Sequence, residues 1–291
     1  MGVATPGGAA AAAQFDFSSA NADECAAFLA EIAILAGPAI MEVYVRPAEF
    51  SAKADGSPVT IADERAEAVI AQALQARAKP IPLIAEEAVA AGGSIQTERL
   101  FLLVDPLDGT KEFISGNGEF TVNVALVKDG LPRAGAVFAP ALGRLWFGGA
   151  NAYACEVAVG APLPARSAWR GIKARRAGEA LGAVASRSHA DPATEAFLEG
   201  LPIGARRSAG SSLKFCLLAE GEADVYPRFA PTMEWDTAAG DAVLRAAGGV
   251  VLSVAGGDLR YGKAETKLLN GGFVAWGDPA YAAELAKVKK M

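Results

Sequence analysis

Two aspartates three positions apart are the side chains in this sequence that most directly suggest chemistry. They lie in the segment 105–110 (DPLDGT), directly after the apolar run 100–104. Proline and glycine favour a tight turn, so both carboxylates can point to one place, with the Leu107 carbonyl between them. Mg²⁺ prefers such oxygen ligands in a compact octahedron. The segment therefore indicates a site for a hard divalent cation, although an isolated turn of this kind is more often a surface feature.

Three further polar segments strengthen this interpretation. Glu86 and Glu87 follow a short apolar run, and residues 235–240 (WDTAAG) place Asp236 at the expected start of a helix. Residues 53–60 (KADGSPVT) form a polar loop before another helix. Taken singly, these features are typical of a solvated glutamate pair, a helix N-cap and a capped loop. The presence of all of them in one chain is more specific evidence for a cation site than any one of them alone.

The histidine and cysteine content excludes several other kinds of site. The single histidine, His189, cannot supply a two-histidine metal site, and a Ser-His-Asp triad would need it as the base. The cysteines are Cys25, Cys155 and Cys216, which are far apart and form no Cys-x-x-Cys motif. This argues against a zinc knuckle or a disulfide framework and favours a reducing compartment. Hydrolytic chemistry in this chain would depend on carboxylates and hard cations.

Composition limits the partners of the protein. With 291 residues, 52% of them hydrophobic, the chain is long enough for one large or two smaller folded domains. The formal net charge of -6 argues against nucleic acid as a partner. No segment reaches the ~18 apolar residues that would suggest an integral membrane span. Residues 1–13 are rich in alanine and glycine without basic residues, which predicts a flexible tail and not a signal peptide. Oligomeric state is not predicted.

The helices and strands that we expect around these residues indicate an α+β fold. We expect a helix over 22–44 bent at Pro38, a helix from Thr60, and a hairpin turn at Asp129-Gly130. The remaining expected elements are strands at 83–84, 100–104, 121–127, 134–138, 184–185, 250–254 and 273–276, and helices at 192–198, 211–219 and 235–247. We divide the chain into a flexible tail (1–18), an N-terminal α+β metal-binding domain (19–155) and a C-terminal α/β domain that completes the active site (156–291).

Together, Glu86-Glu87 and the segments 105–110 and 235–240 resemble the inositol monophosphatase superfamily of lithium-sensitive, magnesium-dependent phosphatases. The resemblance extends in order from about Ala22 to Trp276. It implies a layered α/β/α/β/α sandwich of the inositol monophosphatase and fructose-1,6-bisphosphatase type.

Finer features are similar to one branch, the CysQ-type 3'(2'),5'-bisphosphate nucleotidases. They are the segments 53–60, 111–113 (KEF), 186–189 (SRSH), 210–216 (GSSLKFC) and 226–229 (YPRF). This resemblance implies hydrolysis of adenosine 3',5'-bisphosphate to AMP and phosphate, a step linked to sulfate assimilation. It implies a cytoplasmic enzyme and allows peripheral association with the cytoplasmic side of the inner membrane.

The resemblance also implies metal ligands. Glu86, Asp105 and the Leu107 carbonyl would hold one Mg²⁺, and Asp105, Asp108 and Asp236 a second, with a third ion near Glu86. Inhibition by Li⁺ and Ca²⁺ is expected from the family.

Catalytic and substrate-binding roles follow from the same resemblance. Asp55 and Thr110 match the pair that positions and deprotonates the attacking water, and the Gly109 and Thr110 amides would face the phosphate. The implied substrate-binding set is Glu86, Leu107, Asp108, Gly109, Thr110, His189, Ser211, Lys214, Arg228 and Asp236.

Two alternatives remain open. The first is an inositol monophosphatase or another sugar-phosphatase of the same superfamily, although the segments 111–113 and 211–216 favour the nucleotidase. The second, from a different class, is a non-catalytic protein that binds a phosphorylated metabolite.

Overall fold

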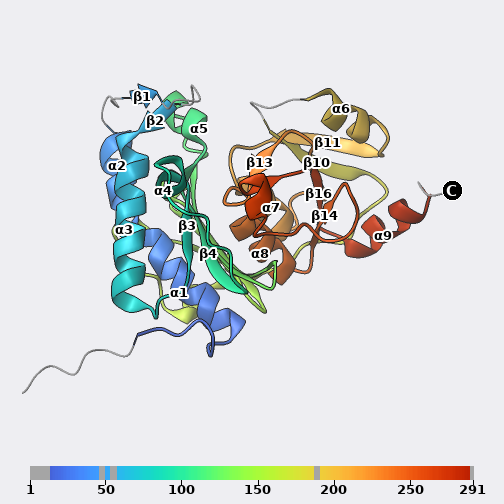
Figure 1. Cartoon of the computed structure of the whole chain (residues 1–291). Coiled ribbons are helices and arrows are strands. Elements are labelled where there is room, and N and C mark those ends of the chain that lie inside the picture. The colour runs from blue at the N-terminus through green and yellow to red at the C-terminus, as the bar shows by residue number, and fades with distance from the viewer. Residues whose placement is uncertain (1–13, 46–49, 53–57, 187–190, 289–291) are drawn as a thin grey trace, which may run out of the picture.

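Two mixed β-sheets alternate with layers of helices in this computed structural model (Figure 1). The structure describes residues 14–45, 50–52, 58–186 and 191–288. Within them the helices are α1 (Ala22–Leu35), α2 (Gly37–Tyr44), α3 (Ile61–Arg77), α4 (Glu86–Ala90), α5 (Thr110–Ser115), α6 (Pro192–Glu199), α7 (Leu213–Ala219), α8 (Ala238–Ala246) and α9 (Pro279–Val288).

The first sheet has seven strands, in the order β3-β4-β5-β6-β7-β8-β9. Their bounds are β3 (Leu83–Ala85), β4 (Leu100–Asp108), β5 (Thr121–Lys128), β6 (Leu131–Ala139), β7 (Arg144–Gly148), β8 (Ala152–Glu156) and β9 (Arg170–Ile172). The predicted hairpin joins β5 to β6. Asp129 and Gly130 both have positive φ, 53° and 76°, as a two-residue hairpin turn requires.

The second sheet has five strands, in the order β11-β10-β12-β16-β14. Their bounds are β10 (Leu181–Ala185), β11 (Ile203–Ser208), β12 (Val225–Arg228), β14 (Val250–Ser253) and β16 (Phe273–Trp276). Two small two-stranded sheets pair β1 (Phe50–Ala52) with β2 (Pro58–Thr60), and β13 (Thr232–Met233) with β15 (Leu269–Asn270).

Three buried clusters show how the layers stack. One lies between helices α1–α3 and the first sheet, a second between that sheet, helices α7 and α8 and the second sheet, and a third between the second sheet and helices α6 and α9. Side chains of β4 alternate between the first two clusters: Leu102 and Val104 face one, Phe101 and Leu103 the other. The apolar run before Asp105 is continuous because this sheet is covered on both faces. The predicted layered α+β sandwich is confirmed.

The predicted helix over 22–44 is two helices. α1 starts with a capping box in which Asn21 and Glu24 bond each other's backbone, and Pro38 stands in the first turn of α2. One sequence expectation needs correction here. By length and composition alone, Ala22–Tyr44 is apolar enough to cross a membrane, and 56% of its most apolar window is buried inside the protein. A core helix of a soluble protein passes the same test, so this stretch is weak evidence for a span.

Residues 14–18 differ from the flexible tail that we expected over 1–18. Phe15 forms a β-bridge with Ala78, and Phe17 is 1% exposed. The rings of Phe15 and Phe28 stack at 4.2 Å between centroids. Apolar contact therefore fixes this segment beside α1 and the end of α3, while residues 1–13 lie outside the described part of the chain.

The boundary that we propose between residues 155 and 156 falls at the end of β8. β9, from the C-terminal side of this boundary, adds to the edge of the first sheet through Ala152–Ile172 pairing. The chain after residue 156 therefore still contributes β9 to the first sheet, and the second sheet begins only with β10.

The two halves approach each other closely where α8 crosses β6 at Gly135. A Cβ atom there would lie 2.7 Å from the Ala239 carbonyl oxygen and 2.9 Å from the Ala242 Cβ. Both are backbone or short side-chain atoms that cannot move aside cheaply, so a glycine is required.

We expect Gly135→Ala to lower the free energy of unfolding by about 1–3 kcal/mol, because the added methyl pushes α8 away from the sheet. Gly171→Ala is the matched control, since a Cβ at Gly171 meets nothing within 4 Å. Urea denaturation of both variants measures the difference. Equal stabilities would show that the α8–β6 contact is not tight.

Candidate active site

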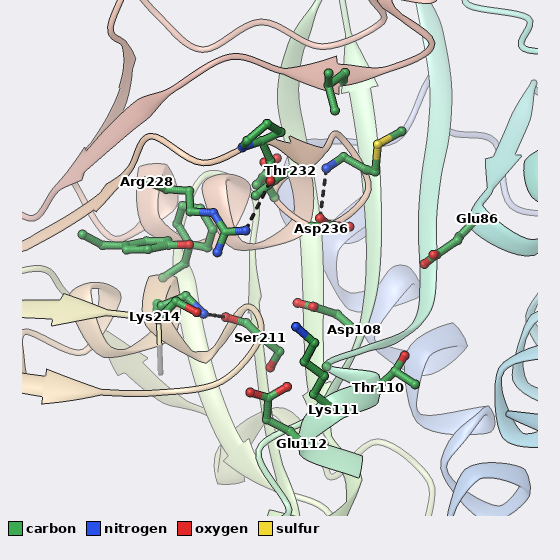
Figure 2. A pocket seen from close by; sticks show the side chains of 18 residues that line it. Glu86, Asp108, Thr110, Lys111, Glu112, Ser211, Lys214, Arg228, Thr232 and Asp236 are labelled. Atoms are coloured by element: carbon green, nitrogen blue, oxygen red, sulfur yellow. Dashed lines mark hydrogen bonds between the residues drawn. The ribbon is translucent and has the colours of Figure 1, made fainter. Parts of the chain in front are cut away.

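A pocket of about 380 Å³ is lined by residues from both halves of the chain (Figure 2). Glu86 and Thr110 lie on one side of it, Lys214 and Arg228 on the other, with Asp108 and Asp236 between them. Its size is that of an ordinary small-molecule site. The pocket therefore brings most of the predicted site residues to one place.

The DPLDGT segment reaches the pocket through a β-bulge. We expected a turn that ends the strand, but β4 continues to Asp108. Asp105 pairs with Asn123 and Asp108 with Thr121, so β4 has one extra residue between the pairs. The Leu107 N–H donates to the Asp105 carboxylate at 3.0 Å. A bulge re-aims side chains without ending the sheet, and this one carries both aspartates.

Gly109 and Thr110 follow the bulge directly. Gly109 has a φ of 96°, which only glycine adopts readily, and Thr110 begins α5. A Cβ at Gly109 would lie 3.3 Å from the Ser211 Cβ of the other half. The glycine thus allows the chain to turn sharply from strand to helix against the second half of the molecule.

Glu86 and Asp236 enter the pocket from two other elements. Glu86 is the first residue of α4, and the Glu67 carboxylate caps that helix by accepting from the Glu87 and Ala88 N–H groups at 2.7 Å each. Asp236 precedes α8, which begins at Ala238 with Thr237 as its N-cap, so Asp236 is not the helix cap that the sequence suggested. Its carboxylate accepts from the Met233 N–H at 3.0 Å, so it caps a local turn.

The carboxylates lie close enough to perturb one another. Burial, followed by the charges of Glu86, Asp108 and Asp236, raises the pKa of Asp105 well above its ordinary value. Burial and the charges of Asp108 and Glu86 likewise raise the pKa of Asp236. Burial raises the pKa of Asp108 to about 6, against the opposing charge of Lys214. An arrangement of buried like charges is unfavourable without a compensating cation.

The donor set fits a hard divalent cation. Glu86, Asp105, Asp108 and Asp236 offer only carboxylate oxygens, which Mg²⁺ prefers, and their mutual repulsion is what a divalent charge would relieve. No group of three or more His, Cys, Asp or Glu side chains forms a ready-made metal cage among the residues that the structure describes.

The basic side of the pocket is partly committed to the protein backbone. Lys214 is 4% exposed and its ammonium donates to the carbonyls of Ser211 at 2.5 Å and Ala209 at 3.3 Å. Arg228 donates to the carbonyls of Ala230 at 3.1 Å and Pro231 at 3.2 Å. Each cation keeps donors beyond these bonds, so both can still bind an anion.

Not every predicted residue can be placed. Asp55 and His189 lie outside the described residues, so their distances to the pocket are not stated. Ser211 lines the pocket, but its hydroxyl donates to the Glu119 carbonyl at 3.0 Å. The buried side chain of Leu107 points away from solvent, and its predicted contribution concerns the backbone carbonyl alone.

Sequence reasoning gave no role to several polar residues at this site. Asn123 donates to the Asp108 carboxylate at 3.3 Å, and Asp63 in α3 is buried and raises the pKa of Asp105. Asn123 stands inside a strand and contacts β4 across the sheet, so no local pattern identifies it. A buried aspartate in α3 would have been visible only once the helix packing was known.

Comparisons with known proteins identify the family of this chain. A profile described as the Inositol monophosphatase family matches residues 21–289. The 3'(2'),5'-bisphosphate nucleotidase CysQ of Salmonella typhimurium is 44% identical over 246 residues, which cover 84% of this chain and 96% of that protein.

Solved structures of the same family are also similar to this chain. The crystal structure of CysQ from Bacteroides thetaiotaomicron, described as a bacterial member of the inositol monophosphatase family, matches with a TM-score of 0.73 and 40% identity over 89% of this chain and 98% of the other. An inositol monophosphatase from Anabaena matches with a TM-score of 0.65 and 23% identity over 88% and 91% of the two chains. At that identity the likeness concerns the fold alone.

Proposed function

This chain belongs to the inositol monophosphatase family, and we propose that it is a magnesium-dependent 3'(2'),5'-bisphosphate nucleotidase. It hydrolyses adenosine 3',5'-bisphosphate to AMP and phosphate, the reaction class named for its 44% identical relative. The observation that carries the proposal is a single pocket with carboxylates on one side and two cations, Lys214 and Arg228, on the other. Such a pocket suits a substrate with one phosphate to cleave and a second to hold.

The proposed metal ligands are Glu86, Asp105 and the Leu107 carbonyl for one ion, and Asp105, Asp108 and Asp236 for another, with a third ion near Glu86. When bound, Mg²⁺ supplies charge neutralisation at the phosphate and a more acidic water. The carboxylates of this chain hold and orient the ions, and Li⁺ and Ca²⁺ are expected to compete for the same oxygens.

The remaining roles belong to the protein. Thr110 relays the proton of the attacking water toward Asp55, because a threonine hydroxyl is a poor base alone. The Gly109 and Thr110 amides orient the phosphate to be cleaved. Lys214 and Arg228 bind the second phosphate or the ribose, and Ser211 and His189 complete the nucleotide contacts.

A substrate panel tests the proposal. We expect phosphate release from adenosine 3',5'-bisphosphate with Mg²⁺ to exceed release from inositol 1-phosphate, and Li⁺ and Ca²⁺ to reduce it. A clear preference for the inositol ester would favour the sugar-phosphatase alternative. Tight binding of the bisphosphate without turnover would favour the non-catalytic alternative.

The reaction is proposed for the cytoplasm. Cys25, Cys155 and Cys216 are free and buried, as suits a reducing compartment. Association with the inner membrane is a finer proposal, and fractionation of cells that express the protein tests it.

Lys214 makes substrate binding dependent on pH. Burial lowers the pKa of its ammonium from 10.5 to about 8. The positive charge is therefore present below pH 8 and lost as the pH rises through that value. We expect KM for adenosine 3',5'-bisphosphate to rise by about tenfold per pH unit above 8. KM for 3'-AMP, which lacks the second phosphate, is the control and should change less. Parallel changes for both substrates would contradict a phosphate contact by Lys214.

A further inference from the structure

The segment Gly210-Ser211-Ser212 connects the two aspartates that come from different halves of the protein. Ser212 is 1% exposed, and its hydroxyl donates to the Asp236 carbonyl at 2.7 Å. Its backbone N–H lies close enough to the Asp108 carboxylate to lower the pKa of that group. One buried serine thus contacts both residues, although Asp108 ends a strand of the first sheet and Asp236 precedes α8.

Glu119 holds the same segment from the first half of the chain. It lies between α5 and β5, and its carboxylate accepts from the Gly210 N–H at 2.8 Å. Its carbonyl accepts from the Ser211 hydroxyl at 3.0 Å. Both bonds cross from one half of the molecule to the other.

The backbone of this segment is specialised for that contact. A Cβ at Gly210 would lie 2.6 Å from the Glu119 carbonyl oxygen and 2.7 Å from the Glu112 Cγ, so only glycine fits. Ser211 has a φ of 41°, a left-handed conformation that is uncommon for serine. Neighbouring contacts must stabilise such a conformation, and the Glu119 bonds hold Gly210 before it and the Ser211 side chain itself.

Metal coordination makes the separation of these aspartates important. Mg²⁺ requires oxygen ligands at about 2.0–2.1 Å in near-ideal geometry. Asp108 ends β4, whereas Asp236 lies in the loop between β13 and α8, and no strand pairing joins them, so other contacts must set their spacing. The Ser212 hydroxyl bonds the Asp236 backbone, and the adjoining Ser211 packs against Gly109, the residue after Asp108.

We propose that Ser212 and Glu119 are positioning residues for the Asp108–Asp236 pair: Glu119 fixes the Gly210–Ser211 turn, and Ser212 fixes the two aspartates relative to each other. This assignment rests on the proposed function, because it concerns the same metal ligands. It adds two residues that touch neither substrate nor metal but determine how well the ligands converge.

Mg²⁺ titration calorimetry tests the role of Ser212 without relying on activity. Ser212→Ala removes the bond to the Asp236 carbonyl and should weaken Mg²⁺ binding about 5- to 10-fold. Thr194→Val is the matched control. Thr194 is also buried, and its hydroxyl bonds the carboxylate of Asp191, the N-cap of α6; neither residue lines the pocket. We expect it to lose stability without a change in Mg²⁺ affinity.

A second pair of variants covers the case in which Ser212→Ala does not fold. Glu119 is only partly buried, so its substitution is tolerated more easily. Glu119→Ala should weaken Mg²⁺ binding in the same direction, whereas Glu119→Gln, whose amide oxygen can still accept from the Gly210 N–H, should restore most of it.

The outcomes separate this assignment from the proposed function. If the unmodified protein binds Mg²⁺ and both alanine variants bind it equally well, with only lower thermal stability, the positioning role is overturned and the proposed function stands. If the unmodified protein binds no Mg²⁺ and releases no phosphate, the proposed function fails and the assignment fails with it.

Discussion

Asp105→Asn should reduce magnesium-dependent phosphate release by roughly 1000-fold. Asp105 is the carboxylate proposed to be shared by two ions, so one substitution removes charge from both. Each tenfold loss of rate corresponds to about 1.4 kcal/mol. A 1000-fold loss therefore corresponds to about 4 kcal/mol of the transition-state stabilisation that the metal ions supply. Phosphate release at saturating Mg²⁺ measures the effect.

The same variant should be more stable than the unmodified protein in EDTA. Asp105 is 1% exposed, and Glu86, Asp108 and Asp236 all raise its pKa, so its ionised form is costly to bury. Asparagine keeps the shape and removes the charge. We therefore expect a higher Tm without metal, and a smaller gain in Tm when Mg²⁺ is added.

Asp129→Asn is the matched control for Asp105→Asn. Asp129 is a solvent-accessible hairpin aspartate paired with Arg99, and asparagine tolerates its left-handed φ of 53°. This variant should keep full turnover. Full turnover by Asp105→Asn as well, or a lower Tm in EDTA, would contradict a metal-binding role for Asp105.

The parts of the site that the sequence predicts correctly are local in the chain. Asp105 and Asp108 are separated by two residues, so their shared direction follows from backbone chemistry between them. The apolar run before them also identifies a buried strand. Proline and glycine suggested that the strand ends at Asp105, whereas pairing with β5 carries it to Asp108 through a bulge. Cross-strand partners 13 and 18 positions away, Thr121 for Asp108 and Asn123 for Asp105, decide that outcome, and local propensity does not record it.

The parts that could not be predicted depend on contacts that form only in the folded chain. Ser212 adjoins Ser211 in sequence, yet its importance comes from a carbonyl 24 positions later. Glu119 bonds a segment 91 positions away. Lys214 and Arg228 were predicted as anion ligands, and their bonds to backbone carbonyls became visible only with the fold. Residue type indicates what a side chain can do, but packing determines which of its donors remain available.

Thr110→Val should lower kcat by about 10²- to 10⁴-fold, the usual contribution of general acid–base catalysis. Thr110 begins α5 and lines the pocket beside the bulge that carries both aspartates. Valine matches threonine in shape and keeps the backbone amide that is proposed to orient the phosphate. Only the hydroxyl that relays the proton of the attacking water is lost.

Thr110→Val and a metal-ligand variant such as Asp105→Asn should change different constants. KM and the Mg²⁺ dissociation constant should remain near those of the unmodified protein, because Thr110 is not proposed to hold a cation through its side chain. Thr110→Ser, which retains a hydroxyl, should recover most of the turnover. A fall in Mg²⁺ affinity with unchanged kcat at saturating metal would instead place the Thr110 hydroxyl among the metal-positioning groups. Because Asp105→Asn and Thr110→Val should fail in these two different ways, the pair separates metal binding from proton transfer within one pocket.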